Sequence, residues 1–261
     1  PVISSVIASQ NAGSGNVAIS YTLADLSTSN IELSISSDGG STWTVATNSA
    51  SGDVGAGVSQ GSGKTVTWNA GTNFANQEVS NMRARLRGRD AYGNLGSFTS
   101  SADFAVDTKV PVVSSVTASQ GSSTSTVTIT YSLADASNST VFIDISEDSG
   151  STWGVATSTL LGAIGSGVTP GAKTATWNAA ADFPNREQSG IMVRARATDA
   201  FANASGNTAS SAFTVDTLAP RLTVASASQT LGGQFVSITY NLSEATSTAI
   251  ALDISSNGGS T

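Results

Sequence analysis

The chain of 261 residues contains no cysteine and no histidine, and charged residues make up only 11 % of it, against about 25 % in an average soluble protein. These absences exclude disulfides, zinc sites built from cysteine and histidine, a haem with an axial histidine or cysteine, and Ser-His-Asp or Cys-His catalysis. The net charge of −7 disfavours nucleic acid and anionic membrane surfaces as partners. No apolar run approaches the ~20 residues that are needed to span a bilayer.

An internal repeat, in contrast, covers the whole chain. The segment PVISSVIASQ at Pro1 returns as PVVSSVTASQ at Pro111, and ISYTLAD around Tyr21 returns as ITYSLAD around Tyr131 and as ITYNLSE around Tyr240. KTVTWNAGTNF and AVDTKVP of the first copy return as KTATWNAAADF and TVDTLAP of the second. Such constant spacing indicates one fold that occurs several times.

The repeats predict three units, which are residues 1–109, residues 110–218 and an incomplete third unit, residues 219–261. A unit of about 110 residues has an ordinary domain size, whereas about 40 residues are too few to bury a comparable core. We therefore expect the chain to be a piece of a longer array. The junctions VDTKVP and VDTLAP are short and contain proline, which favours an extended rod over a flexible string of domains.

The local pattern of the sequence is that of β-strands. Val17, Ile19, Tyr21 and Leu23 alternate with small or polar residues, and a period of two predicts a half-buried antiparallel strand. Clusters of glycine, serine, asparagine and aspartate separate such runs, and no segment shows a sustained helical period. About seven short strands in each repeat predict an all-β fold of β-sandwiches.

Two further features bear on the predicted sandwiches. Trp68 and Trp177 are in register with the apolar face of their strands, so we expect them in the cores, where they bury the most apolar surface. The glycine-rich segment 50–63 is predicted to be a long surface connection. Because there is no cysteine, packing alone must hold each sandwich together.

Several motifs together resemble those of tandem immunoglobulin-like or fibronectin-III-like repeats of large bacterial secreted and cell-surface proteins. They are ISSDGGSTW, KTVTWNA, the strands MRARLRGRDAYGN and MVRARATDAFAN, and VDTxxP at each junction. The resemblance implies tandem Ig-like antiparallel β-sandwich domains in an extended array on the outside of a bacterial cell. Such modules serve as stalks, spacers, adhesin arms, filament subunits and accessory modules of enzymes, so the fold does not decide the function.

A polar box of the pattern SxDxGxTW resembles the Asp-box of sialidases and other propeller proteins, where it forms a hairpin turn. Aspartate in a turn accepts hydrogen bonds from backbone N–H groups, glycine adopts positive φ, and tryptophan packs at the base of the hairpin. We expect this structural role, and a tryptophan that stacks on sugars is the alternative. The box residues are Ser36, Asp38, Gly40, Thr42 and Trp43, and Ser146, Asp148, Gly150, Thr152 and Trp153.

A second group of residues is acidic and lies towards the end of each repeat. Ca²⁺ prefers carboxylate and carbonyl oxygens, and the family resemblance implies Ca²⁺ between domains as a means of stiffening the rod. Two interpretations stay open, a Ca²⁺ site at the junction or Asx-turns that hold no ion. No other cofactor is indicated. The candidate ligands are Asp90, Asn94, Asp107, Asp199, Asn203 and Asp216.

A third group is a stripe of arginines along one strand of each repeat. The stripe is a candidate contact face for an anion or for an acidic surface of another copy of the protein. The simpler interpretation is a solvated face whose arginines pair with Glu32 on a neighbouring strand and lie with their stems over apolar surface. The stripe consists of Arg83, Arg85, Arg87 and Arg89 in the first repeat, and Arg194 and Arg196 in the second.

Catalysis has little support in the sequence, because the acidic residues lie mostly in turns and differ between the repeats. We therefore predict a non-enzymatic extracellular protein, a rod-like stalk or spacer of a bacterial surface protein, with cell-surface ligands or other protein copies as partners. One alternative is a subunit of a self-assembling fibre or S-layer-like lattice. A second is a carbohydrate-binding accessory module of a secreted enzyme, for which Trp43, Trp153, Tyr92 and Phe201 are the candidate stacking residues.

Overall fold

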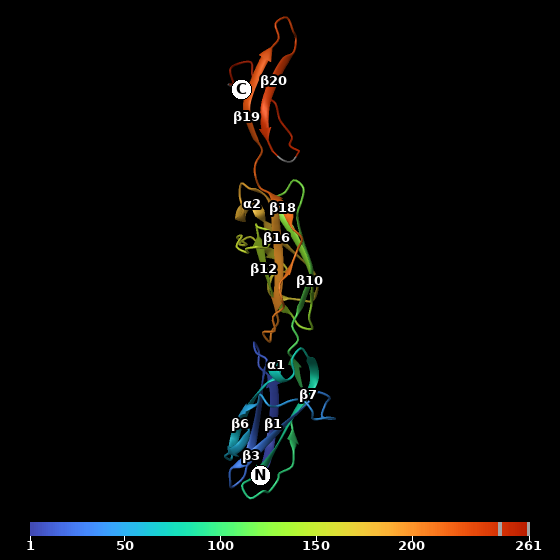
Figure 1. Ribbon diagram of the computed structural model, residues 1–261, viewed down its shortest axis with the longest axis vertical. Helices are drawn as coiled ribbons and strands as arrows, with labels where there is room; N and C mark the ends of the chain where they lie inside the picture. The colour runs from blue at the N-terminus through green and yellow to red at the C-terminus, as the bar shows by residue number, and fades with distance from the viewer. Residues whose placement is uncertain (245–246, 260–261) are drawn as a thin grey trace.

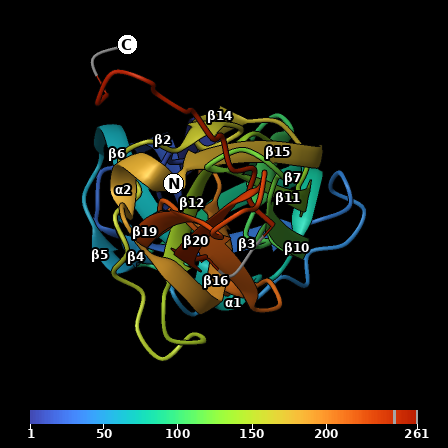
Figure 2. The same cartoon turned by 90° about the horizontal axis from the view of Figure 1, so that it is seen from above.

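The computed structural model describes residues 1–244 and 247–259 and arranges them as three units that follow one another along one long axis (Figure 1). Seen down that axis, the units overlie one another (Figure 2). Strands β1–β9 lie in the first predicted repeat, β10–β18 in the second, and β19 and β20 in the third. No helix in these two described ranges is long and apolar enough to cross a membrane.

The elements of the two complete repeats follow one another in the same order. Those of the first are β1 (Val2–Gln10), β2 (Asn16–Ala24), β3 (Ser29–Ser36), β4 (Ser51–Gly52), β5 (Gly55–Val58), β6 (Gly61–Asn69), the helical turn α1 (Ala70–Asn73), β7 (Glu78–Asp90), β8 (Thr99–Ser100) and β9 (Phe104–Asp107). Those of the second are β10 (Val112–Gln120), β11 (Thr126–Ala134), β12 (Ser139–Ser146), β13 (Leu161–Gly162), β14 (Gly165–Val168), β15 (Gly171–Asn178), α2 (Ala179–Asp182), β16 (Glu187–Thr198), β17 (Thr208–Ala209) and β18 (Phe213–Asp216).

Each complete repeat is a sandwich of two antiparallel sheets. In the first repeat, one sheet has the order β1-β2-β6-β4 and the other β5-β3-β7-β8, with β9 also paired to β7. The second repeat has the orders β10-β11-β15-β13 and β14-β12-β16-β17, with β18 paired to β16. Immunoglobulin-like domains divide their strands in this way, with A, B, E and D in one sheet and C, F and G in the other. The predicted fold class, tandem Ig-like β-sandwiches, is confirmed.

The alternation along the strands determines which side chains form the core. Val17, Ile19, Tyr21 and Leu23 of β2 are at most 2 % exposed, and burying such a side chain contributes about 1.5–3 kcal/mol. Trp68 and its counterpart in the second repeat are fully buried, as predicted. Both sheets supply side chains to one hydrophobic cluster, so the two sheets are held together by the side chains on their facing surfaces.

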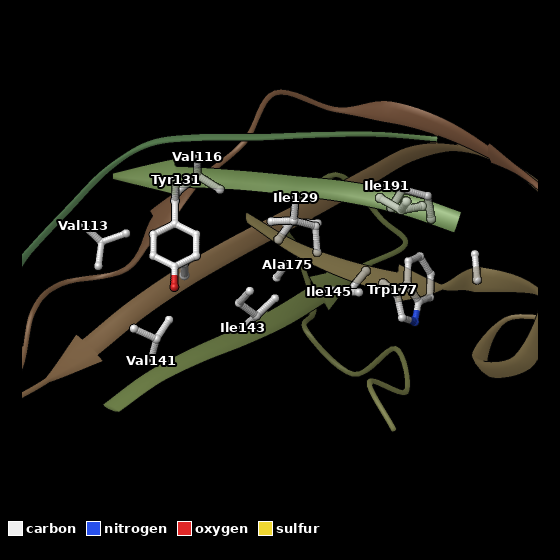
Figure 3. Packing of buried hydrophobic residues seen from close by; sticks show 14 of the residues in the cluster. Val113, Val116, Ile129, Tyr131, Val141, Ile143, Ile145, Ala175, Trp177 and Ile191 are labelled. Atoms are coloured by element: carbon white, nitrogen blue, oxygen red, sulfur yellow. The ribbon is translucent and has the colours of Figure 1, made fainter. Parts of the chain in front are cut away.

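The core of the second repeat is drawn in Figure 3. Ile129 and Tyr131 come from β11, Ile143 and Ile145 from β12, and Trp177 from β15, and they all point into the space between the sheets. Interiors of proteins are packed as densely as organic crystals, so each of these side chains restrains its neighbours. In the absence of a disulfide, this packing is what joins the two sheets.

The buried tryptophan of each repeat needs an acceptor for its indole N–H. Trp68 Nε1 donates to Ala46 O at 3.0 Å and to Asn73 Oδ1 at 3.1 Å. In the second repeat, Trp177 Nε1 donates to Asp182 Oδ2 at 3.0 Å. Asn73 and Asp182 occupy the same place at the end of the helical turns α1 and α2, which hold the acceptor over the core.

Two local features differ from the prediction. The segment 50–63, expected as a surface connection, contains β4, β5 and the start of β6, because Gly52 and Gly55, at φ of +95° and +80°, let the chain turn between very short strands. The helical turns α1 and α2 were not expected either. Four residues are too few to show a 3.6-residue period, and Asn69 caps α1 by accepting a bond from Thr72 N at 2.9 Å.

The third unit is described as one antiparallel pair, β19 (Arg221–Gln229) with β20 (Val236–Ser243). Its register repeats that of the earlier pairs, since Leu222 lies opposite Leu242 as Val113 lies opposite Leu133. A register shift also recurs near the middle of β19, as in β1 and β10. The same local sequence therefore builds the same strand pair three times.

We expect Asp182→Leu to destabilise the second repeat by at least about 1–3 kcal/mol, because it leaves the buried Trp177 N–H without an acceptor and also removes the acceptor of Thr159 N. Asp182→Asn keeps an acceptor oxygen, as Asn73 does in the first repeat, and is expected to change stability much less. Urea unfolding followed by tryptophan fluorescence measures both effects, with the transition of the first repeat as internal reference. Equal losses in the two variants would contradict the role given to the acceptor.

Candidate functional site

The junction between the first two repeats is bridged by direct hydrogen bonds. Gly13 N, in the loop after β1, donates to Ala200 O in the loop after β16 at 2.8 Å. Asn203 Nδ2 of the same loop donates to Asp107 O at 3.2 Å. Each bond joins one repeat to the other, in addition to the linker that covalently connects them. Both contacts restrict how far one repeat can swing against its neighbour.

A groove lies beside these hydrogen bonds. Val79 and Val106 line it from the first repeat, and Ala136 and Phe201 line it from the second. Phe201 is half-buried there, whereas its counterpart in the first repeat, Tyr92, is 86 % exposed. The contact between the repeats is therefore partly apolar.

A glutamine side chain holds the strand end at this junction. Gln10 Nε2 donates to Asp107 O at 2.7 Å, and Asp107 N donates to Gln10 Oε1, also at 2.7 Å. The pair recurs in the second repeat, where Gln120 makes the same two bonds with the backbone of Asp216, again at 2.7 Å each. This glutamine clamp fixes where the last strand of each repeat ends and the linker begins.

Three carboxylates converge at the clamped strand end. Asp107 of the first repeat meets Asp135 and Asp199 of the second, with one oxygen of each within 4.8 Å of the others. Asp107 and Asp199 are only 7 % and 8 % exposed. The sequence prediction named Asp107 and Asp199 but missed Asp135. The signal for Asp135 was its place at the end of ITYSLAD, where Asp25 ends ISYTLAD.

Electrostatics disfavour three charges at this place. Burial raises the pKa of Asp107, the N–H of Lys109 opposes that shift, and the charges of Asp199, Asp135 and Glu78 add to it. Within residues 1–244 and 247–259, no lysine or arginine forms an ion pair with the three clustered carboxylates. Buried like charges of this kind are stabilised by a proton or by a cation.

The cluster has the chemistry and the size that Ca²⁺ requires. Ca²⁺ binds oxygen at about 2.3–2.6 Å, so two oxygens on one ion can lie up to about 5 Å apart, and the three carboxylates satisfy this. Ca²⁺ takes six to eight oxygens, so backbone carbonyls and water would have to supply the rest. Ca²⁺ binding here stays a prediction. Its ligands would be the predicted Asp107 and Asp199 together with Asp135.

The other predicted ligands do not add an oxygen to this cluster. Asp90 and Asn94 form a turn beside the N-terminus, in which Asp90 Oδ1 accepts from Asn94 N at 2.7 Å and Asn94 Nδ2 donates to Asp90 Oδ2 at 2.7 Å. This is the Asx-turn interpretation. Asp216 lies at the second junction, where its Oδ1 accepts from Leu218 N at 3.0 Å. Asn203 turns its amide nitrogen, not its oxygen, towards Asp199 and the junction.

The polar box forms a closed hydrogen-bonded turn. Ser36 Oγ donates to Asp38 Oδ1 at 2.7 Å and accepts from Gly40 N at 2.8 Å, and Thr42 donates to Asp38 through N and Oγ1 at 2.8 and 2.6 Å. Hydrogen bonds from Ser36 and then Thr42 lower the pKa of Asp38 to about 2. The second copy makes the corresponding bonds around Asp148. The kinship with the Asp-box itself stays a prediction.

The arginine stripe of the first repeat lies on the outer face of β7. Arg87 Nη2 pairs with Glu32 at 2.7 Å, as expected, and Arg83 pairs with Asp103. Arg85 stacks between Trp43 and Phe98, with its guanidinium carbon 4.2 and 4.0 Å from the ring centroids. Its buried Nε has no hydrogen-bond partner. The remaining member, Arg89, is exposed.

The second repeat uses its two stripe arginines differently. Arg194 pairs with Asp144 at 2.9 Å and stacks on Trp153 at 4.5 Å, while Arg196 stacks on Phe142 at 4.2 Å. Both box tryptophans therefore offer a ring face to an arginine of their own repeat. This contact competes with the stacking of a sugar on that face.

Comparison with known proteins adds little to these observations. No model of a protein family and no curated protein matches this chain. Among solved structures, it is similar to the D00-D0 domain of intimin, with 12 % sequence identity, a TM-score of 0.25, and coverage of 82 % of this chain and 100 % of that chain. The fold assignment rests on the strand order of each repeat.

We expect Ca²⁺ to raise the melting temperature of the chain and EDTA to lower it, because an ion among the three carboxylates stabilises the docked repeats. At a concentration of a hundred times the Kd, the stabilisation is about 2.7 kcal/mol. Asp199→Asn should remove the response. Asp90→Asn is the matched control, since Asp90 makes the same turn away from the junction. Differential scanning calorimetry measures each shift.

A chain whose melting temperature ignores millimolar Ca²⁺ would contradict a metal site. In that case Asp107→Asn is expected to stabilise the junction at neutral pH. The folded-state pKa of Asp107 is raised, so its ionisation costs stability as the pH rises through the carboxyl range, and asparagine removes that cost.

Proposed function

We propose that the chain is a non-enzymatic structural protein, a rod-like stalk or spacer of a bacterial surface protein. The single observation that carries the proposal is the junction between the first two repeats, where Gly13 bonds to Ala200 and Asn203 to Asp107. A flexible string of domains would have no need of direct bonds across its linker. A spacer needs them, because its reach depends on the angle between successive domains.

The stiffness of the rod comes from several small contributions. A hydrogen bond contributes about 0.5–1.5 kcal/mol net, and the short linker between Asp107 and Pro111 leaves few torsions free. Domains joined by a modest interface move against each other by default. The two bonds and the partly apolar groove therefore favour the extended arrangement without locking it.

The bacterial surface location follows from the family resemblance of the repeated motifs. Cell-surface ligands or other protein copies are the proposed partners. Negative-stain electron microscopy of native material tests this function directly. Isolated thin rods are expected, and long fibres of uniform width would instead make the chain a subunit of an assembly.

We expect Asn203→Ala to loosen the junction, because it removes the bond to Asp107 O. The chain has no cysteine, so Thr65→Cys and Thr174→Cys on opposite sides of the junction accept spin labels selectively. Electron-spin distance measurements should give a narrow distribution that broadens in Asn203→Ala. Asn94→Ala, which disturbs the equivalent turn of the first repeat, is the control and should leave the distribution unchanged. A distribution that is broad from the outset would overturn the stiff rod.

The fibre or lattice alternative has one observation in its favour. Arg85 lies opposite Ser34 across the β3–β7 pair, where the second repeat places Asp144 opposite Arg194. Arg85 therefore lacks the carboxylate that its counterpart has. Its two faces lie against Trp43 and Phe98, so only the edge of its guanidinium is left to meet an acidic surface of another copy. The chain has 18 acidic residues against 11 basic ones, so acidic groups outnumber the cations that could pair with them.

Under this alternative, we expect the chain to self-associate and Ser34→Asp to weaken the association, because the new carboxylate occupies Arg85. Sedimentation velocity at low and high salt measures this self-association, which should weaken at high salt because ions screen exposed charge pairs. Thr128→Asp, on the other sheet of the second repeat, is a control of equal charge. Association that is unchanged in Ser34→Asp would exclude the stripe as its interface.

A carbohydrate-binding module is the less supported alternative. Trp43 and Trp153 each stack on an arginine, and Phe201 lies in the groove between the repeats. Of the four candidate aromatics, Tyr92 is the most open, at 86 % exposed. One open ring is a small platform for a sugar chain, and both box tryptophans already stack on arginines. We therefore expect that glycans do not quench the tryptophan fluorescence.

A further inference from the structure

The N-terminal end of the first repeat has the same surface groups that the second repeat uses at its junction. Asp199 Oδ1 accepts from Phe201 N and Asn203 N at 2.8 and 2.9 Å. Asp90 Oδ1 accepts the same two bonds, at 2.9 and 2.7 Å, from the N–H groups two and four residues further on. In both loops an asparagine amide then donates to the other carboxylate oxygen at 2.7 Å. The two loops therefore have the same shape.

A serine–aspartate hydrogen bond that occurs in both repeats extends the match. Ser29 Oγ donates to Asp25 Oδ2 at 2.8 Å, and Ser139 Oγ donates to Asp135 Oδ2 at 3.0 Å. Two of the three carboxylates at the junction thus have counterparts at the N-terminal end. The third carboxylate of the junction, Asp107, belongs to the repeat that precedes.

The exposure of the two surfaces differs, although their geometry does not. Tyr92 is 86 % exposed, and Leu26 is fully exposed. The counterpart of Tyr92, Phe201, is half-buried against the groove that Val79 and Val106 line. The N-terminal end therefore presents a largely exposed aromatic ring, and its asparagine amide donates within its own loop, where Asn203 of the second repeat also donates to the repeat before it.

We propose that this end of the first repeat is a docking surface for the C-terminal end of another repeat of the same type. That partner would present a backbone carbonyl, a carboxylate and two valines, as Asp107, Val79 and Val106 do at the observed junction. The Asn94 amide would donate to the carbonyl, and Tyr92 would pack in the groove. The inference rests on the proposed function, because it treats the junction as the standard joint of a rod.

The small size of the contact favours a partner that is covalently tethered to the first repeat over a separate chain. Two hydrogen bonds and one groove are a small contact beside the roughly 1,200 Å² or more that specific interfaces between separate proteins bury. A short tether raises the effective concentration to the millimolar range and makes so small a contact sufficient. The partner is therefore a repeat joined to Pro1 through the same linker, not a separate chain.

The test places a second copy of residues 1–110 directly before Pro1. The linker VDTKV is then followed by PVISS, as it is followed by PVVSS in the chain itself. Thr65→Cys in the added repeat and in the original first repeat carries the spin labels. The pair at Thr65 and Thr174 across the observed junction is the reference. We expect the new distance distribution to be as narrow as the reference.

The variant Asn94→Ala separates docking from the effect of the linker. In the present chain, Asn94→Ala is expected to leave the Thr65–Thr174 distance distribution unchanged. In the extended chain, the same substitution in the original first repeat should abolish the narrow distribution at the new junction. A broad distribution at the new junction, beside a narrow reference, would overturn the docking surface and leave the rod intact. A narrow distribution that persists in Asn94→Ala would also overturn it, since the linker alone would then set the geometry. A broad reference would instead refute the proposed function.

Discussion

Both complete repeats depend on one recurring contact, the pairing of a glutamine side chain with the backbone of an aspartate at the far end of the domain. Gln10 and Asp107 are 97 residues apart and lie at the ends of the first and last strands. An amide side chain carries both N–H donors and an acceptor oxygen, so it satisfies both backbone groups on the edge of β9 that β7 leaves open. The clamp closes the sandwich where the next repeat begins, and the geometry of the junction follows from it.

Period-two alternation was sufficient to predict the sheets and their cores, but not the junction. The pattern around Val17 and the register of Trp68 depend only on neighbours within a strand, which a single sequence displays. The cluster of Asp107, Asp135 and Asp199 depends on two sandwiches lying end to end. The prediction found two of these residues through their repeated motifs and missed Asp135. The aspartate at the end of ISYTLAD and ITYSLAD recurs too, but the strand pattern does not show that this end of β11 faces the preceding repeat.

Comparing the two repeats separates contacts that the fold requires from contacts that it tolerates losing. The acceptor for the buried indole is kept, although Asn73 becomes Asp182. The ion pairs of the stripe are not kept, since Ser34 stands where the second repeat has Asp144. An unsatisfied buried N–H costs about 1–3 kcal/mol, whereas an exposed ion pair contributes about 0.2–1 kcal/mol. The two repeats agree where the energy at stake is large.

The junction combines contacts that hold the repeats together with charges that push them apart. The bonds of Gly13 and Asn203 favour docking, while Asp107, Asp135 and Asp199 repel one another in a place with little water. Hydrogen bonds alone could have been built without the buried carboxylates. Buried like charges are stabilised when a proton or a cation neutralises them. If the proposed Ca²⁺ binds there, the joint between the two repeats is expected to depend on the ionic surroundings as well as on its own hydrogen bonds.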